Sequence, residues 1–148
     1  MKPKLILMSH GHLALELSRS AQMIIGETEG LYTVSMLESD GLEGTQGKLN
    51  AVLEEIGPDA SVLVCADLLS GTPCNVAVQA MYQRPNLRVL TGLNLAMAIE
   101  YAVSDLEDVD ELAAYLQEVG QTGVRLVEEF DRPLAEQEEM IYNRRKAL

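Results

Sequence analysis

The stretch Leu5-Ile6-Leu7-Met8-Ser9-His10-Gly11 decides how this chain can fold. Its apolar residues predict a short buried strand that stops at Ser9 and His10, and a helical pattern begins at about Leu13. In an open α/β sheet, ligands bind where a strand ends and the following helix begins. His10 is therefore a candidate functional residue.

A second buried strand, Val62 to Ala66, also ends in a polar residue, Asp67. The first and third strands of a doubly wound sheet commonly lie side by side, about 4.8 Å apart. We therefore expect His10 and Asp67 to lie within hydrogen-bonding distance. A carboxylate bonded to one ring nitrogen fixes the tautomer and leaves the other nitrogen free to act as a nucleophile. A histidine that only bonds a structural neighbour stays an alternative.

Strand and helix patterns alternate along most of the chain, with short connections between them. Such connections imply parallel strands joined by right-handed crossovers. We therefore expect an α/β fold, a three-layer sandwich with a mainly parallel, doubly wound central sheet in the order 2-1-3-4. Besides the two strands above, we expect strands at Leu31–Leu37 and Leu87–Leu90, helices at Leu13–Gly26, Leu49–Ile56, Pro73–Arg84, Asn94–Ala102 and Leu112–Val119 (interrupted at Gly120 and Gly123), and a glycine-rich turn at Asp40–Gly44.

The end of the chain has a weaker pattern. Val124 to Phe130 fits strand alternation as well as a helix, and as a strand it would add an antiparallel edge to the sheet. Residues 131–148 have little apolar content, and we expect a frayed helix or a disordered tail there. The chain has 148 residues with 47% hydrophobic content, so residues 1–130 are predicted to form one domain.

Composition narrows the classes of partner. The chain has 11 Lys and Arg residues against 23 Asp and Glu, a net charge of −12. This surface repels nucleic acid and anionic membranes and favours a partner with a basic face, although acidity can also serve solubility alone. The sequence has no apolar stretch with the length of a signal-peptide core or a membrane span. We expect a cytoplasmic protein with no direct membrane insertion.

The loop after Asp67 reads Leu-Leu-Ser-Gly-Thr-Pro-Cys-Asn and ends at Asn75. We expect the Thr72 hydroxyl to be an N-cap and Pro73 to be the first helical residue. Amide N–H groups at the start of this helix, together with the Thr72 hydroxyl, would hold a dianionic phosphoryl group without a basic side chain. A capped helix with no ligand is the alternative, and the pairing with His10 favours phosphate.

The two cysteines do not suggest a secreted disulfide framework. Cys65 lies in a predicted buried strand, and Cys74 lies in the first turn of a predicted helix. A helix N-terminus can lower a thiol pKa, so Cys74 is a candidate nucleophile. We favour the interpretation of Cys74 as a small hydrophobic residue.

Other histidine chemistries fit the sequence less well. His10 and His12 could bind a metal with Asp67, but the amidohydrolase barrel that uses such a pair needs ~250 residues. A histidine phosphatase would need an arginine where this chain has Ser9. The G-x-G-x-x-G spacing of a nucleotide-binding turn does not follow Gly11. We therefore expect neither a metal nor another cofactor.

These motifs resemble those of the enzyme IIA components of the mannose-type bacterial sugar phosphotransferase system. The resemblance rests on Ser9-His10-Gly11, on DLLSGTPCN from Asp67 to Asn75, and on TGLNLAMAIE from Thr91 to Glu100, and it extends over residues 4–130. The chain has Ala96 where the family often has proline, which leaves the start of that helix in question.

The resemblance implies a phosphotransferase that works through a phosphohistidine, and a dimer. His10 would accept a phosphoryl group from the phosphocarrier HPr and pass it to a IIB component. Asp67 would orient His10, and Thr72, Gly71 and Gly11 would contact the phosphoryl group. A phosphorylation-dependent regulatory or adaptor domain, or the phosphocarrier subunit of a dihydroxyacetone kinase, remains an alternative on the same scaffold.

A homodimer is also expected from the segment Leu93 to Val103, which is apolar on nearly every side. One sheet can cover only one side of a helix, so this helix either lies deep in the core or faces another subunit. Its position near the sheet edge favours the second subunit. A partner contributing its Val124 to Phe130 segment as a strand would also cover the open edge.

Overall fold

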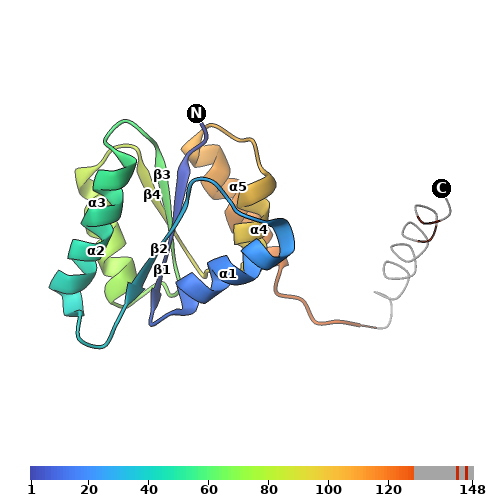
Figure 1. The fold of residues 1–148 in the computed structure, drawn as a ribbon, viewed down its shortest axis with the longest axis horizontal. Coiled ribbons are helices and arrows are strands. Elements are labelled where there is room, and N and C mark those ends of the chain that lie inside the picture. The colour runs from blue at the N-terminus through green and yellow to red at the C-terminus, as the bar shows by residue number, and fades with distance from the viewer. Residues whose placement is uncertain (129–142, 144–145, 147–148) are drawn as a thin grey trace.

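A parallel β-sheet forms the middle layer of the molecule, seen in the computed structural model that describes residues 1–128, 143 and 146 (Figure 1). Its strand order is β2-β1-β3-β4, and every neighbouring pair is parallel. The expected fold class and strand order are confirmed, and no antiparallel edge strand occurs among the described residues. The strands are β1 (Lys4–His10), β2 (Leu31–Met36), β3 (Val62–Ala66) and β4 (Leu87–Thr91).

Helices cover both faces of the sheet (Figure 1). On one face lie α2 (Gly41–Ile56) and α3 (Thr72–Gln83), and on the other lie α1 (Leu13–Ile25), α4 (Leu95–Val103) and α5 (Val109–Thr122). Each face has its own apolar core, and β1 contributes to both. The two cores fix the orientation of β1 and therefore of its last residues.

Side chains of β1 alternate between the two cores. Leu5 and Leu7 belong to the core under α1 and α4, whereas Ile6 and Met8 belong to the core under α2 and α3. The same alternation turns Ser9 towards the α1 side and His10 towards the α3 side. The carboxyl end of β1 thus presents His10 beside the loop that leads into α3.

The glycine-rich turn expected at Asp40–Gly44 is wrong, because α2 begins at Gly41. The Asp40 carboxylate folds over the helix start, accepting hydrogen bonds from Leu37 N at 2.6 Å and from Lys48 Nζ at 2.6 Å. A Cβ on Gly44 would lie 2.9 Å from the Asp40 Cβ, so glycine leaves room for this arrangement. Glycine is a poor helix former, and these bonds help to hold the start of the helix.

One side of helix α4 packs into the core, and the expectation that the helix also faces another subunit stays a prediction. Met97, Ala98 and Tyr101 are buried, and α4 packs against both α1 and α5. The Asn94 side chain accepts a hydrogen bond from Met97 N at 3.2 Å and caps the helix, so Ala96 does not disturb its start. Burial against α1 and α5 thus accounts for part of the apolar composition of α4.

Helix α5 runs through Gly120 without the expected interruption and ends at Thr122. Residues 124–128 form no strand, and Val124, Leu126 and Val127 are 80–84% exposed. Phe130 and most of the expected tail at 131–148 lie outside the described residues. In the part of the chain that is described, no helix has the length and apolarity to cross a membrane.

Candidate functional site

His10 and Asp67 meet at the carboxyl edge of the sheet. His10 Nδ1 lies 2.8 Å from Asp67 Oδ2, and the His10 backbone N–H donates to the same oxygen at 2.9 Å. The strands β1 and β3 are direct neighbours, which brings the two residues together across the separation in sequence. The His10 side chain is 45% exposed and that of Asp67 is 9% exposed, so the ring is open to a ligand while the carboxylate is covered.

The Asp67 carboxylate is held from several directions. Its Oδ1 accepts a hydrogen bond from Leu68 N at 2.9 Å, and its own backbone N–H donates to Met8 O at 3.0 Å. Burial by itself raises the pKa of Asp67, but the hydrogen bonds from His10 and Leu68 outweigh it and hold the pKa below its ordinary value. The carboxylate is therefore ionised near neutral pH, and His10 must present Nδ1–H to it. This tautomer leaves a lone pair on Nε2.

Gly71 lies against the free edge of the imidazole. A Cβ at this position would be 2.9 Å from His10 Cε1 and 3.1 Å from Nε2. Gly71 also has a φ of +104°, in the left-handed region that favours glycine. Both the backbone conformation and the contact with the ring require a residue without a side chain. The structure thus places the predicted residue Gly71 beside Nε2 of His10.

The N-cap expected at Thr72 is wrong. Helix α3 begins at Thr72, and Gly71 is the cap residue, since its carbonyl accepts the first hydrogen bond of the helix from Asn75 N at 3.0 Å. Pro73, expected as the first helical residue, is the second. Because a glycine supplies the cap position, the Thr72 hydroxyl makes no cap hydrogen bond and remains available to a ligand.

The expected phosphoryl contact of Gly11 stays a prediction, but its amide is not free to make it. Its N–H already donates to Met36 O at 2.7 Å, so this amide has no free proton for a phosphoryl oxygen. Its φ is +58°, which allows the chain to turn sharply between β1 and α1. Gly11 therefore shapes the turn that carries His10.

Cys74 is buried at the start of α3. Burial raises the pKa of its thiol, and the negative charge of Asp67 raises it further. The thiol is protonated near neutral pH, which argues against a nucleophilic role. His12 precedes α1 and is exposed, and no cluster of three metal-ligating side chains forms among the described residues.

A set of exposed leucines lies at the same edge of the sheet as the site, and sequence patterns did not single them out. They lie in the segments that follow the tips of β1, β2 and β3, and Leu69 is 82% exposed. Their positions just after strand ends are the signal that could have found them. This group, called the leucine rim, consists of Leu13, Leu37, Leu42, Leu68 and Leu69.

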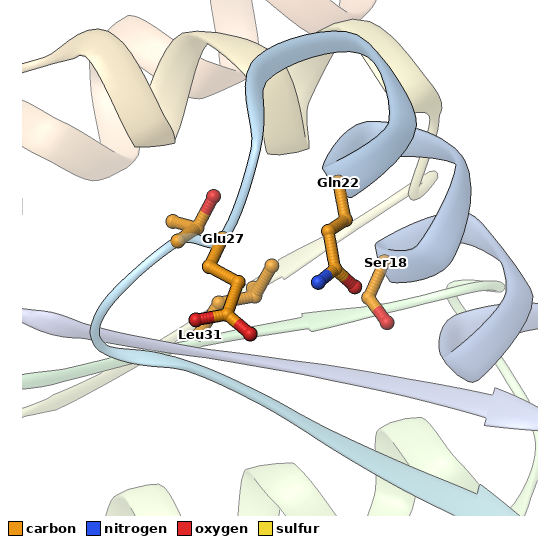
Figure 2. A pocket seen from close by; sticks show the side chains of 5 residues that line it. Ser18, Gln22, Glu27 and Leu31 are labelled. Atoms are coloured by element: carbon orange, nitrogen blue, oxygen red, sulfur yellow. The ribbon is translucent and has the colours of Figure 1, made fainter.

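A polar pocket of about 270 Å³ lies between α1 and the start of β2 (Figure 2). It is lined by Ser18 and Gln22 of α1 and by the segment that leads into β2, including Glu27 and Leu31. Leu31 begins β2, whereas His10 pairs with Met36 at the other end of that strand. The pocket is therefore at the opposite edge of the sheet from His10.

Comparisons with known proteins agree with the architecture of the site. The family described as the fructose IIA component of the phosphotransferase system (PTS) matches residues 4–117. The chain is similar to the PTS sorbose-specific EIIA component of Lacticaseibacillus casei, with 29% identity over 134 residues, 90% of this chain and 91% of that protein. It is also 28% identical over 123 residues to the mannose-specific EIIAB component of Escherichia coli K12, covering 82% of this chain and 38% of that longer protein.

A solved structure shares both the fold and much of the sequence. The mannose/sorbose specific IIA subunit of the phosphotransferase system from Enterococcus faecalis superimposes with a TM-score of 0.83 at 59% sequence identity. The match covers 86% of this chain and 96% of the Enterococcus subunit.

Proposed function

Because this chain belongs to the enzyme IIA family of the mannose, sorbose and fructose phosphotransferase systems, we propose that it carries a phosphoryl group on His10. The donor is phospho-HPr, the acceptor is a IIB component, and the exchange takes place in the cytoplasm. The observation that carries the proposal is the His10–Asp67 pair, with Nδ1 and Oδ2 at 2.8 Å.

The pair supports nucleophilic attack by Nε2. In the proposed step, the Nε2 lone pair forms a bond to phosphorus while the P–N bond of the donor histidine breaks, and the electron pair of that bond returns to the donor ring. The proton on Nδ1 stays between the ring and Asp67, so the positive charge that develops on His10 faces a carboxylate. Transfer to IIB is the same step in reverse with a different partner.

The start of α3 supports binding of the transferred group. The first amides of a helix have no acceptor within the helix, and they favour anions. Gly71 borders Nε2, and the Thr72 hydroxyl is free of a cap role, so a phosphoryl group on Nε2 would lie against this turn. Phosphoryl transfer needs alignment and charge stabilisation, which dipoles of this kind provide.

The leucine rim supports a protein as the phosphoryl donor and acceptor. Leu68 and Leu69 follow Asp67 in the loop that leads to α3, and they are 57% and 82% exposed. Exposed apolar side chains around a polar centre are typical of a protein interaction surface. The net charge of −12 favours a partner that presents basic residues around this apolar contact.

The homodimer is part of the same proposal, on different grounds from α4. Strand β4 is an edge of the sheet, and a pocket of about 340 Å³ beside it is lined by Leu90, Thr91 and Val124 among others. The exposed apolar residues at 124–127 are suited to cover an open strand edge of another subunit. We place the partner's Val124 to Phe130 segment on β4, with residues 1–130 as the domain and 131–148 as a tail.

The proposal is tested by incubation of the protein with phosphoenolpyruvate, enzyme I and HPr. Intact-mass analysis should find one added phosphoryl group that is labile to acid and stable to base. His10→Ala should remain folded and take up none, while the matched variant His12→Gln should be labelled like the wild type. Labelling of His10→Ala would overturn the assignment.

Addition of a IIB protein separates this function from the alternatives. A carrier transfers the label to IIB, whereas a regulatory domain retains it and a dihydroxyacetone kinase subunit passes it to its own kinase partner. Retention of label in the presence of IIB proteins would contradict the carrier function.

A further inference from the structure

The Ser9 side chain is polar and buried, and the phosphoryl transfer proposed above gives it no role. Only Ser9 and Thr45 are buried polar residues among the described part of the chain. The Thr45 hydroxyl donates to Gly41 O of its own helix at 2.7 Å, which is a common arrangement in helices. The Ser9 hydroxyl instead joins two different elements, β1 and α1.

The Ser9 hydroxyl accepts a hydrogen bond from Ala14 N at 2.8 Å and donates to Gly11 O at 3.1 Å. The residue at the N-cap of α1, His12, provides no side-chain cap, so Ser9 supplies this bond from the end of the strand. Ser9 follows Leu5 and Leu7 on the same face of β1, and without its hydroxyl this row of side chains would be apolar. A hydroxyl at this buried place is stable only because both bonds are made.

These bonds fasten the turn that carries His10. The Gly11 carbonyl is held by Ser9, and the Gly11 N–H is held by Met36 O at 2.7 Å. With the residues on both sides fixed, the His10 backbone N–H points to Asp67 Oδ2, the oxygen that also bonds the ring. Small shifts of this turn would move ring and backbone together relative to the carboxylate.

We propose that Ser9 is a positioning residue for phosphoryl uptake, which holds the His10–Gly11 turn so that the Nδ1–H tautomer faces Asp67. The inference rests on the proposed function of His10. It differs from a purely structural role, in which Ser9 would stabilise α1 and leave the ring unaffected.

The test compares Ser9→Ala with Thr45→Val, which also removes one buried hydroxyl but lies outside the site. Urea unfolding, single-turnover phosphoryl uptake from phospho-HPr, and ¹⁵N NMR of the His10 ring are measured for each. Ser9→Ala should lower the fraction of the Nδ1–H tautomer and slow uptake on the order of tenfold, since small misalignments of a reacting group have effects of this size. Thr45→Val should lose stability and keep both the tautomer and the rate.

Two conservative variants complete the design. Ser9→Thr keeps the hydroxyl and should restore the tautomer and the rate, and Ser9→Cys, with a weak thiol donor, should give intermediate values. If Ser9→Ala does not fold, the comparison of Ser9→Cys with the wild type replaces it. A wild-type tautomer and rate in a destabilised Ser9→Ala or Ser9→Cys would overturn the proposal. Absence of uptake by the wild type would refute the proposed function, while the tautomer measurement would still decide the effect of Ser9 on His10.

Discussion

Substitution of Gly71 by alanine separates two effects that the structure combines at one residue. The first effect is conformational, because φ of +104° is unfavourable for alanine and costs roughly 1–3 kcal/mol of stability. The second is a collision, because the new Cβ would lie 2.9 Å from His10 Cε1 and 3.1 Å from Nε2. Carbon atoms pack at about 3.5 Å or more, so the ring has to withdraw by roughly half an ångström.

Withdrawal of the ring would strain the bond between Nδ1 and Asp67 and would cover Nε2 with a methyl group. We expect phosphoryl uptake by Gly71→Ala to fall by at least about tenfold, since a misplacement of 1 Å costs on the order of 10²-fold. Gly57→Ala is the matched control: Gly57 has a φ of +89°, and a Cβ there meets nothing within 4 Å. It should lose a similar amount of stability and keep the wild-type rate.

The assay is single-turnover uptake from phospho-HPr by rapid quench, with urea unfolding of each variant under the same conditions. Rates are compared where all variants are folded. Equal uptake by the two alanine variants would refute the argument that Gly71 clears space for the reacting nitrogen.

Three further substitutions and one change of pH test neighbouring parts of the molecule. Asp67→Asn should slow uptake on the order of 10²-fold or more, because an amide can bond the wrong tautomer; equal single-turnover rates would remove Asp67 from the mechanism. The pKa of Asp67 in the folded protein lies below the ordinary 3.8. The ionised carboxylate therefore stabilises the fold above pH 3.8, and this stabilisation is lost as the pH falls through the folded pKa. In urea titrations, the difference in unfolding free energy between wild type and Asp67→Asn should shrink from about pH 6 to pH 3. Thr72→Ala should change the unfolding free energy little, since it removes no cap, while uptake falls; an unaltered rate would remove the hydroxyl from the phosphoryl site. Light scattering of the wild type at micromolar concentration should give about twice the chain mass of 16.2 kDa. Leu126→Lys should give a monomer that is still labelled on His10. A monomeric wild type would contradict the dimer.

The sheet and the meeting of His10 with Asp67 could be predicted because both follow from regular patterns. The buried strands are short apolar runs with a polar residue at the end, and strand order in such sheets follows from short right-handed connections. The carboxyl ends of adjacent parallel strands lie at the same edge. The distance of 2.8 Å between Nδ1 and Oδ2 is therefore the expected outcome of topology.

Other features depend on contacts that no local pattern contains. The start of α2 was missed because glycine normally signals a turn, whereas here Gly44 makes room for Asp40 and its bond to Lys48. The cap of α3 lies at Gly71 because this residue takes a positive φ, which glycine adopts without strain. The location of α4 depended on whether α1 and α5 cover it, which apolar composition alone does not reveal.

The bond between Asp67 and the His10 ring also bears on how long a phosphoryl group would stay. With Nδ1 protonated and facing an ionised carboxylate, a phosphorylated His10 is a cation, and the ring departs from phosphorus as a neutral imidazole. A neutral leaving group departs easily, so the same contact that favours loading also keeps the phosphoryl group reactive. On the proposed function, the charge pair makes His10 a reversible carrier. The phosphorylated fraction of His10 then follows the concentrations of the phosphorylated donor and of the free acceptor.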